Sequence, residues 1–321
     1  MLIVTKFGGS SLADPDRLFR AAGIISDTRQ REQKVLAVVS AVGDTTDELK
    51  EMALEICPKP SLREQDALLS SGEQQSAALM AMALEELGQK AVSLTGWQAG
   101  ILSSGPYGSS DIAFIVPDRI VEALNKGQIP VVAGFQALSP FGDISTLGRG
   151  GSDTTAVALA SALNADECRI YTDVDGIYTA DPRLCPEARL LKEIDFRDML
   201  SLSKSGSQVL HPRAVKMAMA NGVKLRLMSS FKPLPGTELC FLPDGRRPAF
   251  AGVTRDEKSS TVSVAGTAAG SESLAKLISA LGSEGVAVLM GSVEENRISV
   301  KVAPAQLLTA LKIAHSTLLL K

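Results

Sequence analysis

The sequence has few of the residues on which several common kinds of site depend. Its 321 residues include only 2 histidines and 4 cysteines, and the cysteines form no CxxC pair. These numbers argue against a zinc site and do not imply disulfide bonds. With only His211 and His315 available, neither a Ser–His–Asp nor a Cys–His nucleophilic arrangement is expected. His211 directly precedes Pro212 and is expected to cap a helix.

Long apolar runs and an excess of positive charge are also missing. No apolar stretch reaches the roughly 20 residues of a membrane-spanning helix, and the start "MLIVTKFGG" has no basic segment of a signal peptide. The net charge of −3 argues against a nucleic-acid or anionic-membrane partner. Apolar residues make up 45% and charged residues 21%, as in soluble globular proteins. We therefore expect a soluble, reduced, cytoplasmic protein without nucleic-acid or membrane partners.

Short apolar runs alternate with helical patterns through most of the chain. Strands are predicted at residues 2–7, 34–42, 90–96, 129–135 and 168–174, and helices at 14–30, 63–88, 117–127 and 152–165. This alternation predicts an α/β fold, with a mostly parallel open sheet and helices on both faces.

The pattern changes after the proline-rich stretch at residues 232–248. Strands are predicted at 261–266, 286–290 and 296–302, with a helix around Leu274–Leu281 and another near the end. We predict a catalytic domain over residues 1–240 and a small βαββα (α+β) domain over 241–321. This small domain is expected to have a three-stranded sheet, to which residues 249–257 could add a strand.

The motif "KFGGSS" at residues 6–11 ends the first predicted strand. Backbone N–H groups at a glycine-rich turn before a helix can hold an anion, and Lys6 would add a positive charge for a phosphate. The alternative is a tight turn with a surface lysine. Neither a GxxxxGK[ST] loop nor a GxGxxG motif after a strand occurs elsewhere in the chain.

A second motif, "TLGRGGSD" at residues 146–153, surrounds Arg149 with three glycines. An arginine on such a backbone is suited to hold a carboxylate with two hydrogen bonds. Asp153 and Glu73 would hold an ammonium group, so the three side chains predict a site for an α-amino acid. Alternatively, Asp153 or Ser152 caps a helix and Glu73 complements a helix dipole.

The loop "YTDVDGIYTADPR" at residues 171–183 follows a predicted strand. Its three aspartates lack EF-hand spacing, and the carboxyl end of a strand in an open α/β sheet favours a nucleotide site. A purely structural loop is the alternative. Since no general base is evident, a reaction in which an already ionised substrate carboxylate attacks a phosphate fits best.

These motifs, in this order, resemble the aspartokinases of the amino-acid kinase family. The resemblance covers roughly residues 1–230, and "GRGGSDTTAVALA" and "TGWQAGI" are typical of aspartokinases rather than of the wider family. The C-terminal part looks like a shortened ACT domain, the amino-acid-sensing module of such enzymes.

The resemblance implies the amino-acid kinase fold and the phosphorylation of L-aspartate by ATP and Mg²⁺, an early step toward lysine, threonine and methionine. It makes Lys6 and Asp153 the catalytic candidates, and it identifies no metal ligand. The aspartate site would comprise Ser40, Thr45, Glu73, Arg149 and Asp153. The nucleotide site would comprise Lys6, Gly8, Gly9, Ser10, Thr172, Asp173, Tyr178 and Arg183. At Gln208, some relatives have a lysine near ATP.

Two alternatives to this function remain. A kinase for acetylglutamate, glutamate or carbamate would share the sheet and the phosphate glycines, and a non-catalytic ACT sensor would use the C-terminal part alone. We also expect a homodimer through the C-terminal domain. Because the second ACT unit of such enzymes has no counterpart in the sequence, inhibition by lysine or threonine is expected to be weak or absent.

Overall fold

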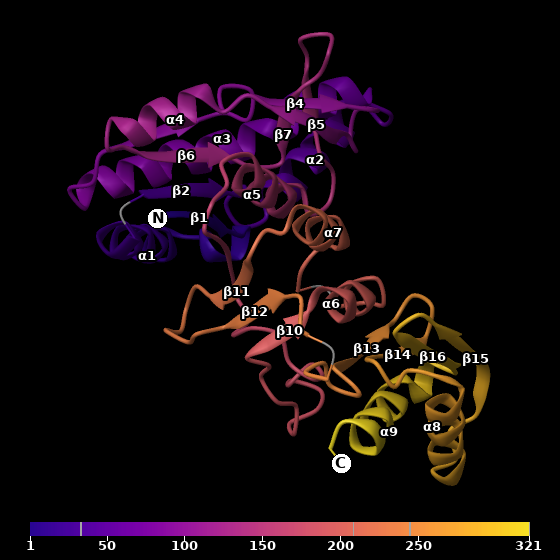
Figure 1. Ribbon diagram of the computed structural model, residues 1–321. Helices are drawn as coiled ribbons and strands as arrows, with labels where there is room; N and C mark the ends of the chain where they lie inside the picture. Colours follow the sequence, from indigo (N-terminus) through magenta and orange to yellow (C-terminus); the bar gives the residue numbers. More distant parts are fainter. Residues whose placement is uncertain (33, 208, 244, 321) are drawn as a thin grey trace. The chain divides into compact units, whose positions relative to one another are not determined.

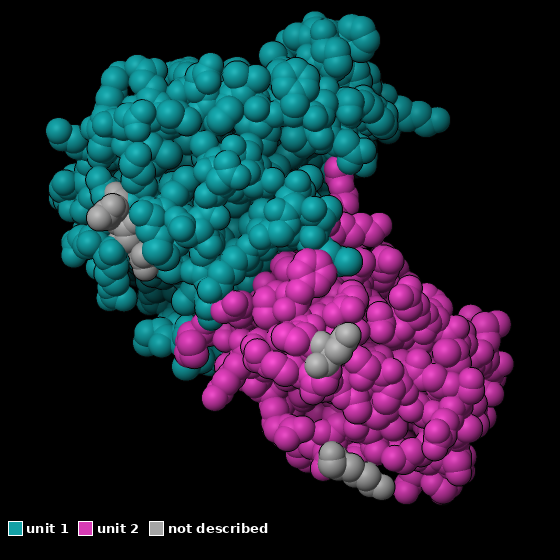
Figure 2. Space-filling model, in the orientation of Figure 1, with its two compact units in different colours: residues 1–175, 217–234 teal, residues 176–216, 235–321 magenta. Residues whose placement is uncertain are grey.

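The computed structural model describes residues 1–32, 34–207, 209–243 and 245–320 (Figure 1). Gln208 therefore lies outside the described residues. Two compact units are present, one of residues 1–175 and 217–234 and the other of residues 176–216 and 235–321, coloured separately in Figure 2. These units divide the chain at other positions than residue 240. The domain boundary predicted after residue 240 stays a prediction. No helix in the described part is long and apolar enough to span a membrane.

The first unit is built on a parallel sheet in the order β11-β9-β1-β2-β6-β3. Its strands are β1 (Leu2–Phe7), β2 (Lys34–Val39), β3 (Ala91–Leu94), β6 (Ile129–Ala133), β9 (Glu167–Thr172) and β11 (Leu225–Ser229). Most of these strands are apolar on both faces, as a sheet covered on both sides requires. The predicted α/β fold is confirmed, and the five strands predicted in this part of the chain are all present.

Helices cover both faces of this sheet (Figure 1). On one face, α1 (Pro15–Glu32) and α3 (Leu62–Glu86) pack on alternate strand residues, including Phe7, Val35 and Val131. On the other face lie α4 (Asp118–Asn125) and α5 (Gly151–Ala162). Because side chains alternate along a strand, Lys6 lies on the opposite face from Phe7, which is the face that α5 covers.

A smaller sheet and one further helix were not predicted, and a second helix was predicted only through its cap at His211. The sheet has the order β5-β4-β7-β8 and consists of β4 (Ile101–Ser104), β5 (Asp111–Ile115), β7 (Gln136–Leu138) and β8 (Ile144–Thr146). The helices are α2 (Thr45–Ile56), which packs on α3, and α7 (Pro212–Asn221), within which the unit boundary falls. His211 Nδ1 accepts a hydrogen bond from Arg213 N (3.3 Å), which fits the predicted cap.

The second unit contains a mixed α+β layer whose antiparallel sheet has the order β13-β14-β16-β15. Its elements are β13 (Gly252–Asp256), β14 (Thr261–Ala265), α8 (Ser271–Ser283), β15 (Val288–Glu294), β16 (Arg297–Val302) and α9 (Leu307–Leu318). The predicted ACT-like arrangement is confirmed. The prediction of only three strands was wrong, whereas the strand that residues 249–257 could add is present, because β13 pairs with β14 along five residues.

The rest of the second unit packs against this sheet. It contains the short parallel pair of β10 (Glu193–Asp195) and β12 (Thr237–Cys240), and α6 (Phe196–Ser203), which lies against β13 and β14. Ala180 and Cys185 join the apolar core of α8, α9 and the four strands. Thr179 Oγ1 lies 2.9 Å from Nε2 of His315, whose ring is buried. Segment 176–216 and the C-terminal sheet thus share one core.

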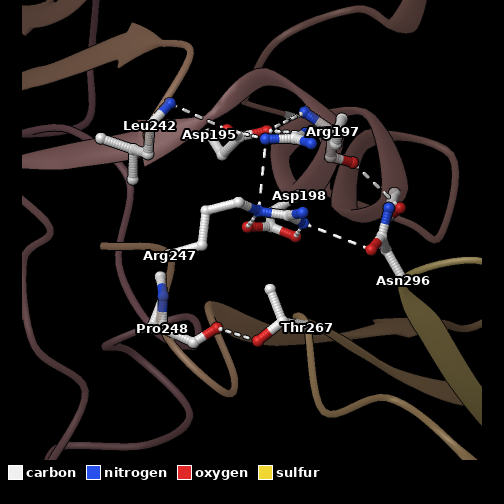
Figure 3. Close-up of polar contacts among 9 residues, drawn as sticks. Asp195, Arg197, Asp198, Leu242, Arg247, Pro248, Thr267 and Asn296 are labelled. Carbon is white, nitrogen blue, oxygen red and sulfur yellow. Dashed lines mark hydrogen bonds and ion pairs between the residues drawn. The ribbon is translucent and has the colours of Figure 1, made fainter. Parts of the chain in front are cut away.

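A buried network of charges joins three segments of the second unit (Figure 3). Arg247 Nη2 lies 2.6 Å from Asp198 Oδ1 and also donates to Asn296 Oδ1 (3.3 Å). Asp198 is fully buried, and this burial raises the pKa of its carboxyl group. Asp195, also fully buried, accepts hydrogen bonds from Arg197 and from Leu242 N, and its pKa is lowered to about 2. Burial opposes this lowering, but the hydrogen bonds outweigh it.

Candidate functional site

A cavity of about 480 Å³ opens in the first unit where β1, β2, α3 and α5 meet. It lies beside the carboxyl ends of β1 and β2, where ligands bind in open parallel sheets. Six of the predicted site residues line the cavity: Lys6, Gly9, Ser40, Glu73, Arg149 and Asp153. Residues from four separate segments of the chain are thereby brought to one site.

Lys6 and Asp153 form an ion pair in the wall of this cavity. Lys6 Nζ lies 2.7 Å from Asp153 Oδ1, and the two side chains are only 11% and 14% exposed. Asp153 stands in the first turn of α5, where the helix dipole also favours a negative charge. Lys6 therefore has a fixed position, held from β1 toward the N-terminus of α5.

Glu73 lies in α3, which is capped at its N-terminus by Ser61, whose hydroxyl accepts a hydrogen bond from Glu64 N. The Glu73 side chain is buried, and its Oε1 accepts a hydrogen bond from Ala41 N (3.2 Å). Its Oε2 is also buried and has no hydrogen-bond partner among the described residues. Burial raises the pKa of Glu73 to about 7, although the positive charge of Lys6 acts in the opposite direction. Glu73 thus presents an unsatisfied acceptor at the cavity.

The glycines around Arg149 have separate structural reasons. Gly148 and Gly150 adopt left-handed conformations, with φ of 70° and 69°, which glycine adopts without strain. At Gly151 a Cβ atom would lie 2.8 Å from the Phe135 ring. Arg149 itself is exposed at the cavity and forms no ion pair within the described ranges of the chain. Its guanidinium group is therefore available for a ligand.

The predicted phosphate turn packs tightly against the segment after β2. Gly9 lines the cavity, and a Cβ atom there would lie 2.8 Å from the carbonyl oxygens of Ala41 and Gly43. Gly8 and Ser10 flank it in the same turn but do not line the cavity. Thr45 does not line the cavity either, and its hydroxyl donates a hydrogen bond to Val42 O (2.7 Å). The next residue, Thr46, does line the cavity.

The predicted nucleotide residues are divided between the two units. In the first unit, Thr172 ends β9 and donates a hydrogen bond to Asp173 Oδ1 (3.0 Å). In the second unit, Tyr178 forms an isolated bridge to Leu190, and Arg183 forms an ion pair with Asp181 (2.8 Å). None of these four residues lines the cavity.

Several lining residues were not predicted from the sequence. They include Thr46, Lys50, Asp66 and Phe135. Asp66 precedes Glu73 by two helical turns in "DALLSSGE", and an aspartate at that spacing in an apolar helix was a usable signal. Phe135 has φ of 70°, which is unusual for a bulky residue and has no sequence signal.

The model of the amino acid kinase family matches residues 1–229. The chain belongs to the amino acid kinase family. Aspartokinase of Mycolicibacterium smegmatis is 50% identical over 237 residues, which cover 74% of this chain and 56% of that protein. Aspartokinase of Corynebacterium glutamicum is 46% identical over 284 residues, covering 87% of this chain and 68% of that protein.

Among solved structures, aspartate kinase from Synechocystis has a TM-score of 0.68 and 40% sequence identity. That match covers 98% of this chain and 54% of the Synechocystis chain. This member of the amino acid kinase family therefore spans between about half and about two thirds of the length of these relatives.

Proposed function

We propose that the chain transfers the γ-phosphoryl group of ATP to the β-carboxylate of L-aspartate, giving 4-phospho-L-aspartate and ADP. The observation that carries this proposal is the cavity that brings Lys6, Glu73, Arg149 and Asp153 together. The names of the related aspartokinases favour aspartate over other amino acids.

The charges around the cavity match an α-amino acid. The exposed guanidinium of Arg149 holds the α-carboxylate with two parallel hydrogen bonds. The unsatisfied Oε2 of Glu73 accepts a hydrogen bond from the α-ammonium group, and Asp153 lines the same cavity. Ser40 lines the same cavity and contacts the substrate, whereas Thr45 does not line it. The β-carboxylate is then directed toward Lys6.

The reaction is an in-line displacement that needs no general base. An oxygen of the β-carboxylate, ionised at neutral pH, forms a bond to the γ-phosphorus of ATP. The bond from this phosphorus to the β,γ-bridging oxygen breaks, and its electron pair leaves with ADP. Lys6, held by Asp153, stabilises the negative charge of the phosphoryl group as it moves.

We infer that ATP is bound by the turn at Gly8, Gly9 and Ser10 and by Thr172 and Asp173, all in the first unit. The nucleotide contacts expected of Tyr178 and Arg183, in the second unit, stay predictions. In the part of the chain that the structure describes, no group of three His, Cys, Asp or Glu side chains could form a metal site. A Mg²⁺ ion would therefore be held mainly by phosphate oxygens of ATP, as magnesium usually is in kinases. When bound, Mg²⁺ neutralises phosphate charge.

A coupled assay of ADP release with a panel of substrates tests the proposal. The panel contains L-aspartate, L-glutamate, N-acetyl-L-glutamate and carbamate, each with ATP and Mg²⁺. We expect L-aspartate to have the highest kcat/KM, because N-acetylglutamate and carbamate have no ammonium group for Glu73. A higher kcat/KM with another substrate, or no ADP release with aspartate, would contradict the proposal.

A further inference from the structure

Asp66 is a fully buried carboxylate at the cavity that plays no part in the proposed reaction. It lies on α3, seven residues before Glu73, and residues seven apart occupy the same face of a helix. Both side chains therefore face the cavity, but their surroundings differ. Glu73 has an unsatisfied oxygen, whereas both oxygens of Asp66 are hydrogen-bonded.

Three donors from two separate loops converge on Asp66. Its Oδ2 accepts hydrogen bonds from Gly108 N (2.8 Å) and from Thr146 N (2.9 Å). Its Oδ1 accepts a third from Thr146 Oγ1 (2.6 Å). A carboxylate has about four acceptor positions, so that most of its capacity is used within the protein.

These contacts fix the segment that carries Arg149. Thr146 is the last residue of β8 and stands three positions before Arg149. Ser110 N donates to Thr146 O (2.9 Å), and a Cβ atom on Gly148 would lie 3.1 Å from Gly108 O. The loop around Gly108 and the loop around Gly148 are thus packed together, and Asp66 is hydrogen-bonded to Gly108 and to Thr146, which precedes Gly148 by two residues.

We propose that Asp66 is a positioning residue, which holds the loop at 146–149 so that Arg149 meets the substrate carboxylate. This inference rests on the proposed function. Asp66 acts through hydrogen-bond geometry and not through its charge on the substrate. An asparagine can reproduce the arrangement, because its amide oxygen accepts from both N–H groups and its NH₂ group donates to the Thr146 hydroxyl. Alanine leaves both buried N–H groups without a partner.

Kinetics of Asp66→Asn and Asp66→Ala separate the two roles. For Asp66→Asn we expect the KM for aspartate to stay within about threefold of the wild type. For Asp66→Ala it should rise about tenfold or more, with the KM for ATP within about threefold. An equal loss in both variants would mean that the charge matters and would overturn the proposal, as would an unchanged aspartate KM in Asp66→Ala. Glu64→Ala, on the exposed side of α3, is the control.

Two further measurements test the proposal if Asp66→Ala does not fold or if the wild-type protein has no measurable kinase activity. If Asp66→Ala is unfolded, Thr146→Val removes only the hydroxyl bond and should raise the aspartate KM about threefold or more. Trypsin cleavage after Arg149 reports loop order without any substrate. We expect faster cleavage in Asp66→Ala and Thr146→Val than in Asp66→Asn or the wild type, and equal rates would overturn the proposal. Lack of aspartate kinase activity in the wild type, by contrast, would refute the proposed function alone.

Discussion

Lys6 Nζ and Asp153 Oδ1 lie 2.7 Å apart, although β1 and α5 are separated by most of the first unit's sequence. The pair sets the ammonium group at the cavity before any phosphate arrives. A positive charge that is already fixed in place needs no rearrangement when negative charge develops on the phosphoryl group. Such a charge increases the rate most because it stabilises the transition state.

We therefore predict that Lys6→Met lowers kcat by about 100-fold or more and changes the KM for aspartate only a few-fold, because interactions made chiefly in the transition state affect kcat. Methionine keeps most of the apolar stem of lysine and removes its charge. Steady-state kinetics with both substrates check this. A kcat within a few-fold of the wild type would leave Lys6 as a residue of the turn only.

Substrate recognition is tested at Arg149. Arg149→Lys keeps the positive charge but loses the planar fork, so we expect the KM for aspartate to rise about 10- to 150-fold. The KM for ATP should stay nearly unchanged. Arg119→Lys, on the exposed side of α4, is the matched control and should change neither constant. An unchanged aspartate KM in Arg149→Lys would remove Arg149 from the site.

The pKa of Glu73, raised to about 7 by burial, predicts a pH dependence of substrate binding. Below this pKa the carboxyl group is neutral and attracts the substrate ammonium less. The KM for aspartate should therefore fall as the pH rises from about 6 to about 8. Glu73→Gln should have a higher KM that no longer depends on pH in this range. A wild-type KM that does not change with pH would contradict the assignment.

The same shift has a consequence for stability. The folded-state pKa of Glu73 lies above its value of 4.5 in the unfolded chain, so that ionisation of the buried carboxyl group disfavours the folded state. This unfavourable contribution is absent below about pH 4.5, grows between pH 4.5 and about 7, and stays constant at higher pH. Glu73→Gln should accordingly have a higher Tm than the wild type at about pH 8, and this difference should vanish near about pH 4. Thermal unfolding of both proteins across this range measures it.

In the second unit, Arg247 and its neighbour Arg246 provide a matched pair of variants. Arg247 is 8% exposed and pairs with buried Asp198, whereas Arg246 is 60% exposed and pairs with Glu193 at the surface. Arg247→Leu leaves a buried carboxylate without its partner and should lower the free energy of unfolding by about 3–5 kcal/mol. Arg246→Leu should change it by about 1 kcal/mol or less. Denaturant unfolding compares the two variants, and equal effects would contradict the prediction.

Local patterns were sufficient to predict the main parallel sheet and much of the site. Apolar runs such as residues 35–39 and 129–133 are buried along their whole length, and short, continuous apolar runs of this kind indicate a buried strand. Lys6 and Arg149 could be proposed because each is a cationic residue beside glycines in a motif suited to hold an anion. Both residues line the cavity.

Features that depend on distant partners left no such pattern. Strands β7 and β8 have only three residues each, too few to show alternation. The bonds from Asp66 to Thr146 join residues 80 positions apart, so no local period indicates them. The fourth strand of the C-terminal sheet, β13, contains Thr254, Arg255 and Asp256, and because of this polar composition the sequence indicated only a possible strand, which pairing with β14 stabilises.

The chain passes from one compact unit to the other after residues 175, 216 and 234. Segment 176–216 therefore belongs with the C-terminal sheet, through the contacts of Thr179 with His315 and of Asp198 with Arg247. In evolutionary terms, a single recombination near residue 240 would separate these partners. Exchange of the C-terminal sheet between relatives would then require the inheritance of segment 176–216 with it, or the simultaneous replacement of both buried polar contacts.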